Sequence, residues 1–195
     1  VTPLTVPNGI TGGTTSSVLT GIRLNGNVVT NTNSVTITFS GLPAGVTTNT
    51  NGQLVIPAGT PATSTLVTYK VCEKLNPTNN CHIVTSTLVI GTGSLTVTPV
   101  TPLTVPNGIS GGTTSSVLTG ITLNGTTVTN TNSVTISFSG LPTGVTTNTN
   151  GQLVIPAGTP AGTHTITYKV CEKLNPTNCH TVTSTLVIGT GSLTV

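Results

Sequence analysis

Apolar and polar side chains alternate in several short stretches of the chain. In residues 34–40 every second side chain is apolar, and residues 65–72 and 81–90 show the same alternation less strictly. Successive side chains of a β-strand point to opposite faces of the sheet, so this alternation predicts half-buried strands. The side chains expected to face inward are Val35, Ile37, Phe39, Val67, Tyr69, Val71, Val84, Leu88 and Ile90 in the first half of the chain, and Tyr168 in the second.

Glycine, proline and asparagine separate these stretches. The Asn25-Gly26 and Asn51-Gly52 pairs predict two-residue hairpins in which both turn residues have positive φ. Residues 53–56 read as a short strand. No stretch shows a helical period of useful length. Short strands divided by turns in this way predict an all-β sandwich.

Two nearly identical copies of this pattern make up the chain. The sequence TPLTVPNGITGGTTSSVLTGI begins at Thr2 and returns from Thr101 with one change, and NPTNNC later shortens to NPTNC. Each copy has the size of an immunoglobulin-like sandwich and is longer than a solenoid repeat. We therefore expect tandem immunoglobulin-like β-sandwich domains, the first in residues 1–98 and the second in residues 99–195.

The joint between the copies, residues 97–102, contains two prolines and no glycine. Proline fixes φ and keeps the preceding residue extended, so we expect a short, semi-rigid connection. Both ends of the sequence fall inside this joint pattern, since Val1 matches Val100 and the final GSLTV matches residues 93–97. We therefore expect a segment of a longer array, whose first partners are neighbouring repeats of the same chain.

Differences between the copies locate the outer faces. Burying an unpaired polar group costs free energy, so an apolar residue is readily exchanged for a polar one only outside the core. The pairs of positions expected to lie outside the core are Arg23/Thr122, Val28/Thr127, Thr65/His164, Leu66/Thr165 and Ile83/Thr181.

Composition narrows the class of protein. Charged residues make up only 4% of the chain, against about 25% in an ordinary soluble domain. The mean hydropathy of +0.30 and the net charge of +3 are nevertheless not those of a disordered chain. Five scattered cations form no basic stripe, so nucleic acid is not an expected partner. No run approaches the ~20 apolar residues that cross a bilayer, so we do not expect this segment to span a membrane.

Each copy has two cysteines on either side of an Asn-Pro turn. A disulfide across the mouth of such a hairpin is geometrically easy, which predicts the pairs Cys72–Cys81 and Cys171–Cys179. Disulfides persist in oxidising compartments, so we expect an extracellular location at the cell surface. The alternative is a metal site of Cys72, Cys81 and His82, which lacks a fourth ligand. We expect neither a metal nor a cofactor.

Groups that could perform catalysis are scarce. The carboxylates are Glu73 and Glu172, one in each copy, and there is no Asp. Ser-His-Asp catalysis, paired-carboxylate glycoside hydrolysis and carboxylate-rich calcium sites therefore lack their partners. His82, His180 and His164 are expected to be solvated strand residues. The sequence predicts no catalytic residues, and we do not expect an enzyme.

Two motifs resemble repeats of bacterial surface proteins. SGLPAGVT at residues 40–47 and TNGQL at 50–54 resemble putative-Ig and cadherin-like repeats. YKVCEKLNPTNNC at residues 69–81 resembles repeats of very large secreted Bacteroidetes proteins, including SprB-like gliding-motility adhesins. The resemblance implies export by the type IX route, attachment to the cell surface and a role in adhesion or gliding. The family has an Asp after the second cysteine, where this chain has His82 or His180.

Three functions are compatible with these observations. The first is a structural stalk or filament repeat of a large secreted adhesin, which explains the repeat, the proline joint and the cysteines. The second is a module that binds glycans or other surface proteins through its Thr- and Asn-rich faces. The third is ice binding, which needs a flat, repeated Thr array, whereas the outward Thr rows here are short.

Overall fold

The structure is a computed structural model that describes residues 2–195. It divides into two compact units, Val1–Gly93 and Ser94–Val195. The boundary lies before the expected one between residues 98 and 99, because Leu95–Val97 form strand β10, which pairs with a strand of unit 2. The expected joint is therefore partly a strand of the second unit.

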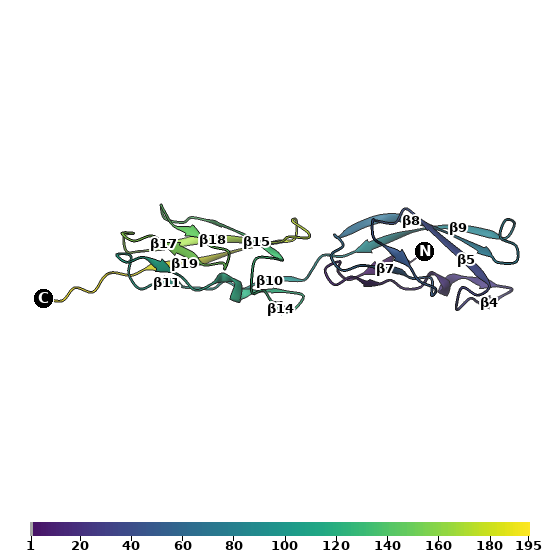
Figure 1. Cartoon of the computed structure of the whole chain (residues 1–195), viewed down its shortest axis with the longest axis horizontal. Helices are drawn as coiled ribbons and strands as arrows, with labels where there is room; N and C mark the ends of the chain where they lie inside the picture. The colour runs from purple at the N-terminus through teal and green to yellow at the C-terminus, as the bar shows by residue number, and fades with distance from the viewer. Residues whose placement is uncertain (1) are drawn as a thin grey trace. The chain divides into compact units, whose positions relative to one another are not determined.

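The strands differ between the units only in small details (Figure 1). Those of unit 1 are β1 (Leu4–Val6), β2 (Gly13–Thr14), β3 (Arg23–Leu24), β4 (Asn27–Val28), β5 (Val35–Ser40), β6 (Thr47–Thr48), β7 (Leu54–Ile56), β8 (Thr63–Glu73) and β9 (Cys81–Ile90). Those of unit 2 are β10, β11 (Leu103–Val105), β12 (Gly112–Thr113), β13 (Ile121–Leu123), β14 (Thr126–Thr127), β15 (Val134–Ser139), β16 (Thr146–Thr147), β17 (Leu153–Ile155), β18 (Gly162–Glu172) and β19 (Cys179–Ile188). A single 3-10 turn also occurs in each, η1 (Val18–Gly21) and η2 (Val117–Gly120).

Each unit is an immunoglobulin-like β-sandwich, as predicted. The larger sheet of unit 1 has the order β1-β9-β8-β5, with β1 parallel to β9 and the other neighbours antiparallel. The second layer holds the β2-β7-β6 sheet and the β3-β4 hairpin (Figure 1). Unit 2 repeats this arrangement with one difference, since β10 joins the hairpin to give the order β10-β13-β14.

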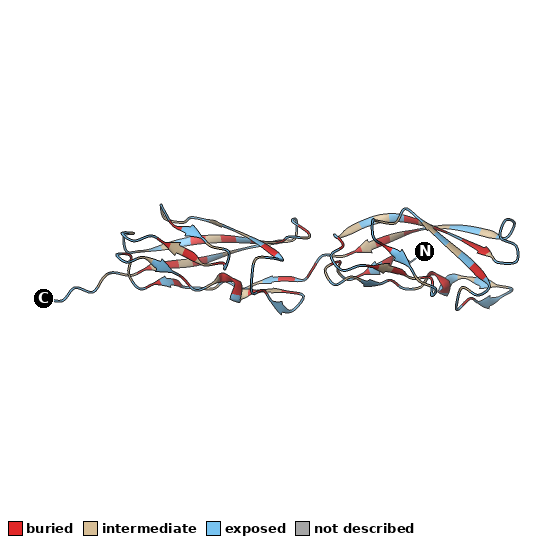
Figure 2. Cartoon of the chain, in the orientation of Figure 1, coloured by how far each residue is buried: buried red, intermediate tan, exposed pale blue. Residues whose placement is uncertain are grey.

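The core of each unit consists mainly of aliphatic side chains. Buried residues alternate with more exposed ones along the strands of both layers (Figure 2). Val67 of β8, Leu88 of β9 and Leu54 of β7 are fully buried. The predicted inward positions are confirmed: seven are buried, Tyr168 of unit 2 among them, and Ile37, Phe39 and Val84 are half-buried against the core of unit 1. None of the five pairs of positions predicted to lie outside the core is buried, whereas the copies also differ by an apolar exchange inside the core, at Val67 and Ile166.

One of the two predicted tight turns is confirmed. Asn25 and Gly26 have φ of 50° and 80° and connect β3 to β4. The prediction for Asn51-Gly52 was wrong, because only Gly52 has positive φ there. The loop between β6 and β7 is longer, and the Asn49 side chain organises it by accepting hydrogen bonds from the amides of Asn51 and Gln53, 3.0 and 3.1 Å.

Among the described residues of unit 1 the buried polar side chains are the hydroxyls of Thr15, Thr60 and Ser86, whereas unit 2 also buries Glu172 and Asn175. The buried Thr15 hydroxyl accepts a hydrogen bond from the Leu54 amide, 3.0 Å, and donates to the Ser16 carbonyl, 2.9 Å. Thr60 donates to the Pro57 carbonyl, 2.6 Å. Within the described residues, every buried side-chain nitrogen or oxygen has a partner. Unit 1 therefore pairs all the buried polar groups of its described residues through short hydroxyl side chains and backbone groups.

Replacement of the fully buried Leu54 tests this account of the core. Leu54→Ala removes packed methyl groups and leaves a cavity, so unfolding of unit 1 should require about 2–5 kcal/mol less. Leu66→Ala is the control, since Leu66 is 67% exposed and its loss should change stability by about 0.5 kcal/mol at most. Urea denaturation of the full chain measures both. Equal effects of the two variants would contradict the burial pattern.

Candidate functional site

The cysteines lie at the end of the long central hairpin of each unit. Cys72 is bonded to Cys81, and Cys171 to Cys179, with Cα atoms 4.1 Å apart in both pairs. These are the expected pairs, and each joins the last residues paired between the two strands of its hairpin. Because the thiols are consumed in disulfides, they are not available as the metal ligands of the alternative interpretation.

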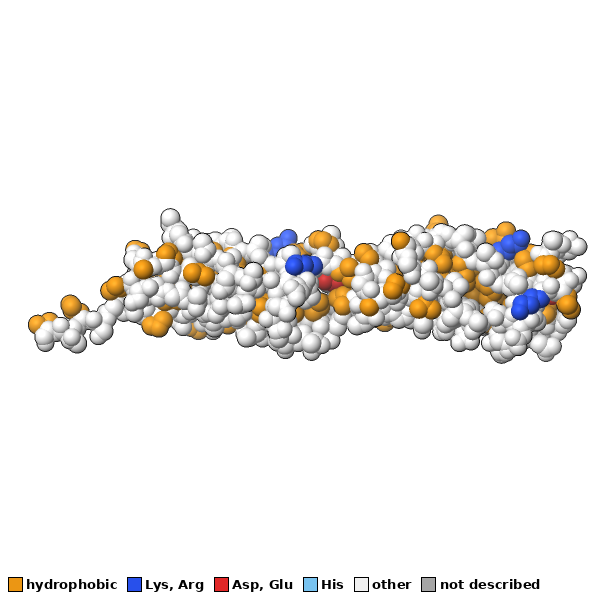
Figure 3. Space-filling model, viewed as in Figure 1, with side chains coloured by type: hydrophobic (Ala, Val, Ile, Leu, Met, Phe, Trp, Pro, Cys, Tyr) orange, Lys and Arg blue, Asp and Glu red, His pale blue; other side chains and the backbone are white. Residues whose placement is uncertain are grey.

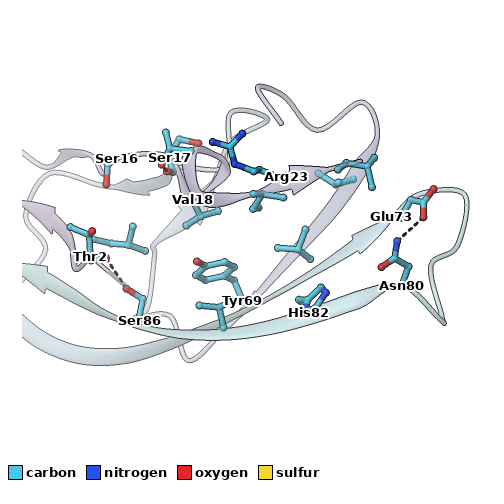
Figure 4. A pocket seen from close by; sticks show the side chains of 18 residues that line it. Thr2, Ser16, Ser17, Val18, Arg23, Tyr69, Glu73, Asn80, His82 and Ser86 are labelled. Carbon is cyan, nitrogen blue, oxygen red and sulfur yellow. Dashed lines mark hydrogen bonds between the residues drawn. The ribbon is translucent and has the colours of Figure 1, made fainter. Parts of the chain in front are cut away.

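A carboxylate held by two asparagines occupies the loop that each disulfide closes. The side-chain amides of Asn76 and Asn80 donate to Glu73 Oε2 at 3.0 and 2.8 Å, and Figure 4 shows the Asn80 bond. These two bonds, Asn80 first, lower the pKa of the Glu73 carboxyl, because they stabilise its charged form. We call this arrangement the Glu–Asn clamp. Sequence reasoning missed it.

Unit 2 keeps the Glu–Asn clamp although its loop is one residue shorter. Asn178 Nδ2 donates to Glu172 Oε2 at 2.8 Å, and Asn175 Nδ2 donates to Glu172 Oε1. The turn accommodates the deletion. In unit 1 the Asn80 backbone amide donates to the Asn76 carbonyl, four residues earlier, and in unit 2 the Asn178 backbone amide donates to the Asn175 carbonyl, three residues earlier. The retention of both asparagines around the deletion was the available signal for the clamp.

The remaining polar groups do not gather into a second site. His82 and His180 are exposed and His164 is half-buried. Among residues 2–195, no three His, Cys, Asp or Glu side chains lie close enough together to hold a metal ion. Lys and Arg side chains are few on the face drawn in Figure 3 and lie towards one end of each unit. Among these residues there is also no helix long and apolar enough to cross a bilayer.

Unit 1 has an open groove between its layers, with a volume of about 550 Å³. Tyr69 projects into it from β8, and Arg23 of β3 and His82 of β9 also line it (Figure 4). Apolar lining comes from Val18, Ile22, Leu24, Val71 and Val84. Burial raises the pKa of the Tyr69 hydroxyl. The groove thus combines an apolar floor with a tyrosine hydroxyl and an edge of β3 with which no strand in residues 2–195 pairs.

In unit 2 the equivalent space is filled by residues 94–100. β10 pairs with β13 there, and the Thr98 amide donates to the Gly120 carbonyl, 2.8 Å. The Val100 amide donates to the Tyr168 hydroxyl, 3.1 Å. Burial raises the pKa of Tyr168, and this hydrogen bond lowers it by a smaller amount, so the pKa stays above its ordinary value. Ile121, the counterpart of the half-buried Ile22, is fully buried.

Gly21 and Gly120 occupy equivalent positions in the two units, and the space around them differs. A Cβ atom added to Gly120 would lie 2.1 Å from the Thr98 carbonyl oxygen, whereas one added to Gly21 would meet no atom within 4 Å. The difference is that a strand passes over the first glycine and not over the second.

Comparison with known proteins gives distant likenesses only. No protein-family profile matches the chain, and no curated protein matches it. Similar solved structures include human protocadherin-24 EC1-2 (14% identity, 82% of this chain and 83% of that chain, TM-score 0.35). They also include mouse cadherin-23 EC22-24 (10%, 98% and 63%, 0.38) and the titin domains Z1Z2 in complex with telethonin (15%, 97% and 93%, 0.39). These values assign neither a family nor a function.

Removal of Asn80 tests the Glu–Asn clamp. Asn80→Ala deletes the donor with the largest effect on the Glu73 carboxyl, so the pKa of Glu73 should rise towards its ordinary value. Folding lowers the pKa of Glu73, so the ionised carboxylate stabilises the folded state. This stabilisation is fully present at pH values above the unfolded-state pKa of about 4.3, and it is lost as the pH falls through the folded-state pKa. NMR titration of the Glu73 side chain measures the shift. Asn27→Ala, a change on the exposed strand β4, is the control and should leave the pKa of Glu73 unchanged.

Proposed function

We propose that the chain is a structural repeat of a secreted bacterial surface adhesin, which gives length to an extracellular stalk or filament used in adhesion or gliding. The observation that carries the proposal is the near-identical repetition of one small disulfide-closed sandwich. Arrays of similar domains serve as spacers because each added unit lengthens the chain and introduces no binding surface or reactive group that the other units lack. The resemblance of residues 40–47 and 69–81 to Bacteroidetes adhesin repeats supports the bacterial assignment.

The disulfides support an extracellular location. Bonds of this kind form and persist outside the reducing cytosol, and small extracellular domains use them to compensate for a limited core. Attachment to the cell surface is part of the proposal. It follows from the resemblance and from the fit of a charge-poor, Thr-rich sandwich to an exposed fibre.

We infer a role without catalysis. Each unit has a single carboxylate, and the two asparagines of the clamp already engage it. The cysteines are bonded to one another, and the chain has no Asp to orient a histidine. Neighbouring repeats are accordingly the proposed partners, and no cofactor is required.

Binding of glycans is the second candidate. Exposed threonines on the outer faces favour it, for example Thr36 and Thr38 of β5. Their hydroxyls can donate and accept hydrogen bonds. Aromatic platforms are missing, since there is no Trp and both tyrosines point into the units.

A binding screen separates the stalk from the glycan-binding module. The full chain, labelled and applied to a glycan array, should show no saturable binding above that of an unrelated sandwich domain. Antibodies raised against the chain should label intact, unpermeabilised cells of the source organism. Reproducible saturable binding to one glycan class, lost in the Thr36→Ala/Thr38→Ala double variant, would replace the stalk by the glycan-binding role. Absence of surface labelling would contradict both.

A further inference from the structure

The longest unpaired strand edge of each unit belongs to its larger sheet. β5 and β15 are each six residues long, and each stands at the end of the strand order of its sheet (Figure 1). No strand among residues 2–195 pairs with their free sides, although unit 2 follows β5 and unit 1 precedes β15. We call these free sides the open edges. Because both units have one, the open edge is a property of the repeat itself.

The other sheet edges are protected against pairing. Every other edge strand among the described residues is only two or three residues long. β1, at the opposite edge of the same sheet, also lies between Pro3 and Pro7. Short strands and prolines are devices that keep sheet edges from pairing. The strands of the open edges, VTITFS and VTISFS, have neither device and contain no charged residue.

The hydrogen-bond pattern shows which backbone groups face the open side of β5. The Lys74 amide donates to the Ser34 carbonyl, 2.9 Å, and these two residues continue the β5–β8 register by one step. Backbone groups of successive residues point to opposite sides of an antiparallel strand. The odd-numbered residues of β5 therefore direct their amides and carbonyls away from β8, and these residues are Val35, Ile37 and Phe39.

We infer that the open edges of two copies of this chain pair with each other as antiparallel strands, β5 with β5 and β15 with β15. Full overlap of residues 34–40 places Ile37 opposite Ile37 of the second copy. Thr36 then lies opposite Thr38, and Val35 lies opposite Phe39. The hydrogen-bond ladder of the larger sheet continues across this contact into the larger sheet of the second copy.

The open edge is complementary to itself in this register. Thr beside Thr, and an aromatic side chain beside a β-branched one, are favourable cross-strand pairs. The inferred register provides both, the first on the outer face and the second on the inner face. The same sheet already contains a pair of the first kind, since the hydroxyls of Thr68 and Thr85 lie 3.3 Å apart. The contact is isologous, because each copy contributes the same surface.

Apolar side chains at the open edge provide a driving force. Ile37 and Phe39 are only half-buried within unit 1, as are their counterparts in unit 2. The Phe39 ring lies against that of Tyr69, with centroids 5.6 Å apart, so its position is fixed before a partner arrives. A neighbouring strand would cover the exposed parts of both side chains, which is favourable.

Charges do not oppose the contact. Lys70 of β8 lies directly opposite Thr38 and is the charged residue closest to the open edge along this sheet level. In the paired sheets the Lys70 residues of the two copies would be three strand spacings apart, about 14 Å. This separation exceeds the Debye length of about 8 Å at physiological ionic strength.

A single pair of open edges forms a small interface. Stable specific interfaces bury about 1,200–2,000 Å², and two six-residue strands bury less. We therefore expect weak association, with a dissociation constant of about 1 mM or below. Each chain has two open edges, so association strengthens where several engage at once. The inference does not rest on the proposed adhesion role.

Charged substitutions test the register of the contact. Glu at Thr36, Thr38, Thr135 and Ser137 places carboxylates directly opposite each other between copies, so association measured by sedimentation velocity should weaken about tenfold or more. Thr36→Lys/Thr38→Glu, with Thr135→Lys/Ser137→Glu, places Lys opposite Glu and should associate at least as well as the unmodified chain. All four positions are exposed, so the fold should remain intact. Loss of association in both variants or in neither would overturn the inference.

Amide hydrogen exchange of the unmodified chain tests the contact without any substitution. Exchange at Val35, Ile37 and Phe39 should slow about twofold or more when the concentration rises from about 20 μM to about 1 mM. Exchange at Thr36 and Thr38, whose amides face β8, should not change. Exchange that is independent of concentration at the first three amides would refute the inference. Slowing only after addition of a peptide of alternating Val and Thr would assign the open edge to another partner and also refute it.

Cysteine crosslinking detects the contact even when it is short-lived. Ser34 and Ser40 are exposed and lie opposite each other between copies in the inferred register. Mild oxidation of the Ser34→Cys/Ser40→Cys variant should therefore produce covalent dimers on a non-reducing gel. The matched control, Ser34→Cys/Thr38→Cys, has the same number of added thiols out of register and should crosslink about tenfold less. Equal yields of dimer from the two variants would contradict the inference.

Discussion

The hairpin of β8 and β9 is the interaction on which the rest of each unit depends. Its two strands are paired from Thr63 and Ile90 to Cys72 and Cys81, and both flanking strands of the larger sheet attach to it. The inward row of this hairpin also provides most of the floor on which the second layer packs. The disulfide fixes the register at the open end, where a slip of one residue would turn every inward side chain towards solvent.

The second layer is built from short strands, and one of them comes from the segment that links the repeats. Residues 94–100 cover the edge of β13 in unit 2, and no strand in residues 2–195 pairs with the matching edge of β3. An exposed strand edge is a site for pairing with another chain unless it is covered. The linking segment therefore has two functions in one sequence, because it connects one sandwich to the next and completes the sheet of the sandwich that follows.

Alternation and turn residues were enough to predict the sandwich, because strands such as β5 carry a clear period of two. The cysteines on either side of an Asn-Pro turn were enough to predict the disulfide pairs. The same pattern could not reveal β10, since residues 97–102 hold two prolines and were interpreted as a linker. What makes Leu95–Val97 a strand is its partner, β13, which is distant in sequence. The Glu–Asn clamp was missed for a related reason. Asn80 lies in a polar loop without a periodic pattern, and only the folded loop brings its side-chain amide to the Glu73 carboxylate.

Near-identity of the two units creates a folding problem that the disulfide hairpin helps to solve. Neighbouring domains of similar sequence can exchange strands during folding, which is a characteristic failure of repeat proteins. Contacts that are local in sequence form first and at low entropic cost. Cys72 and Cys81 lie only 9 residues apart, so the correct hairpin of each unit closes within its own repeat.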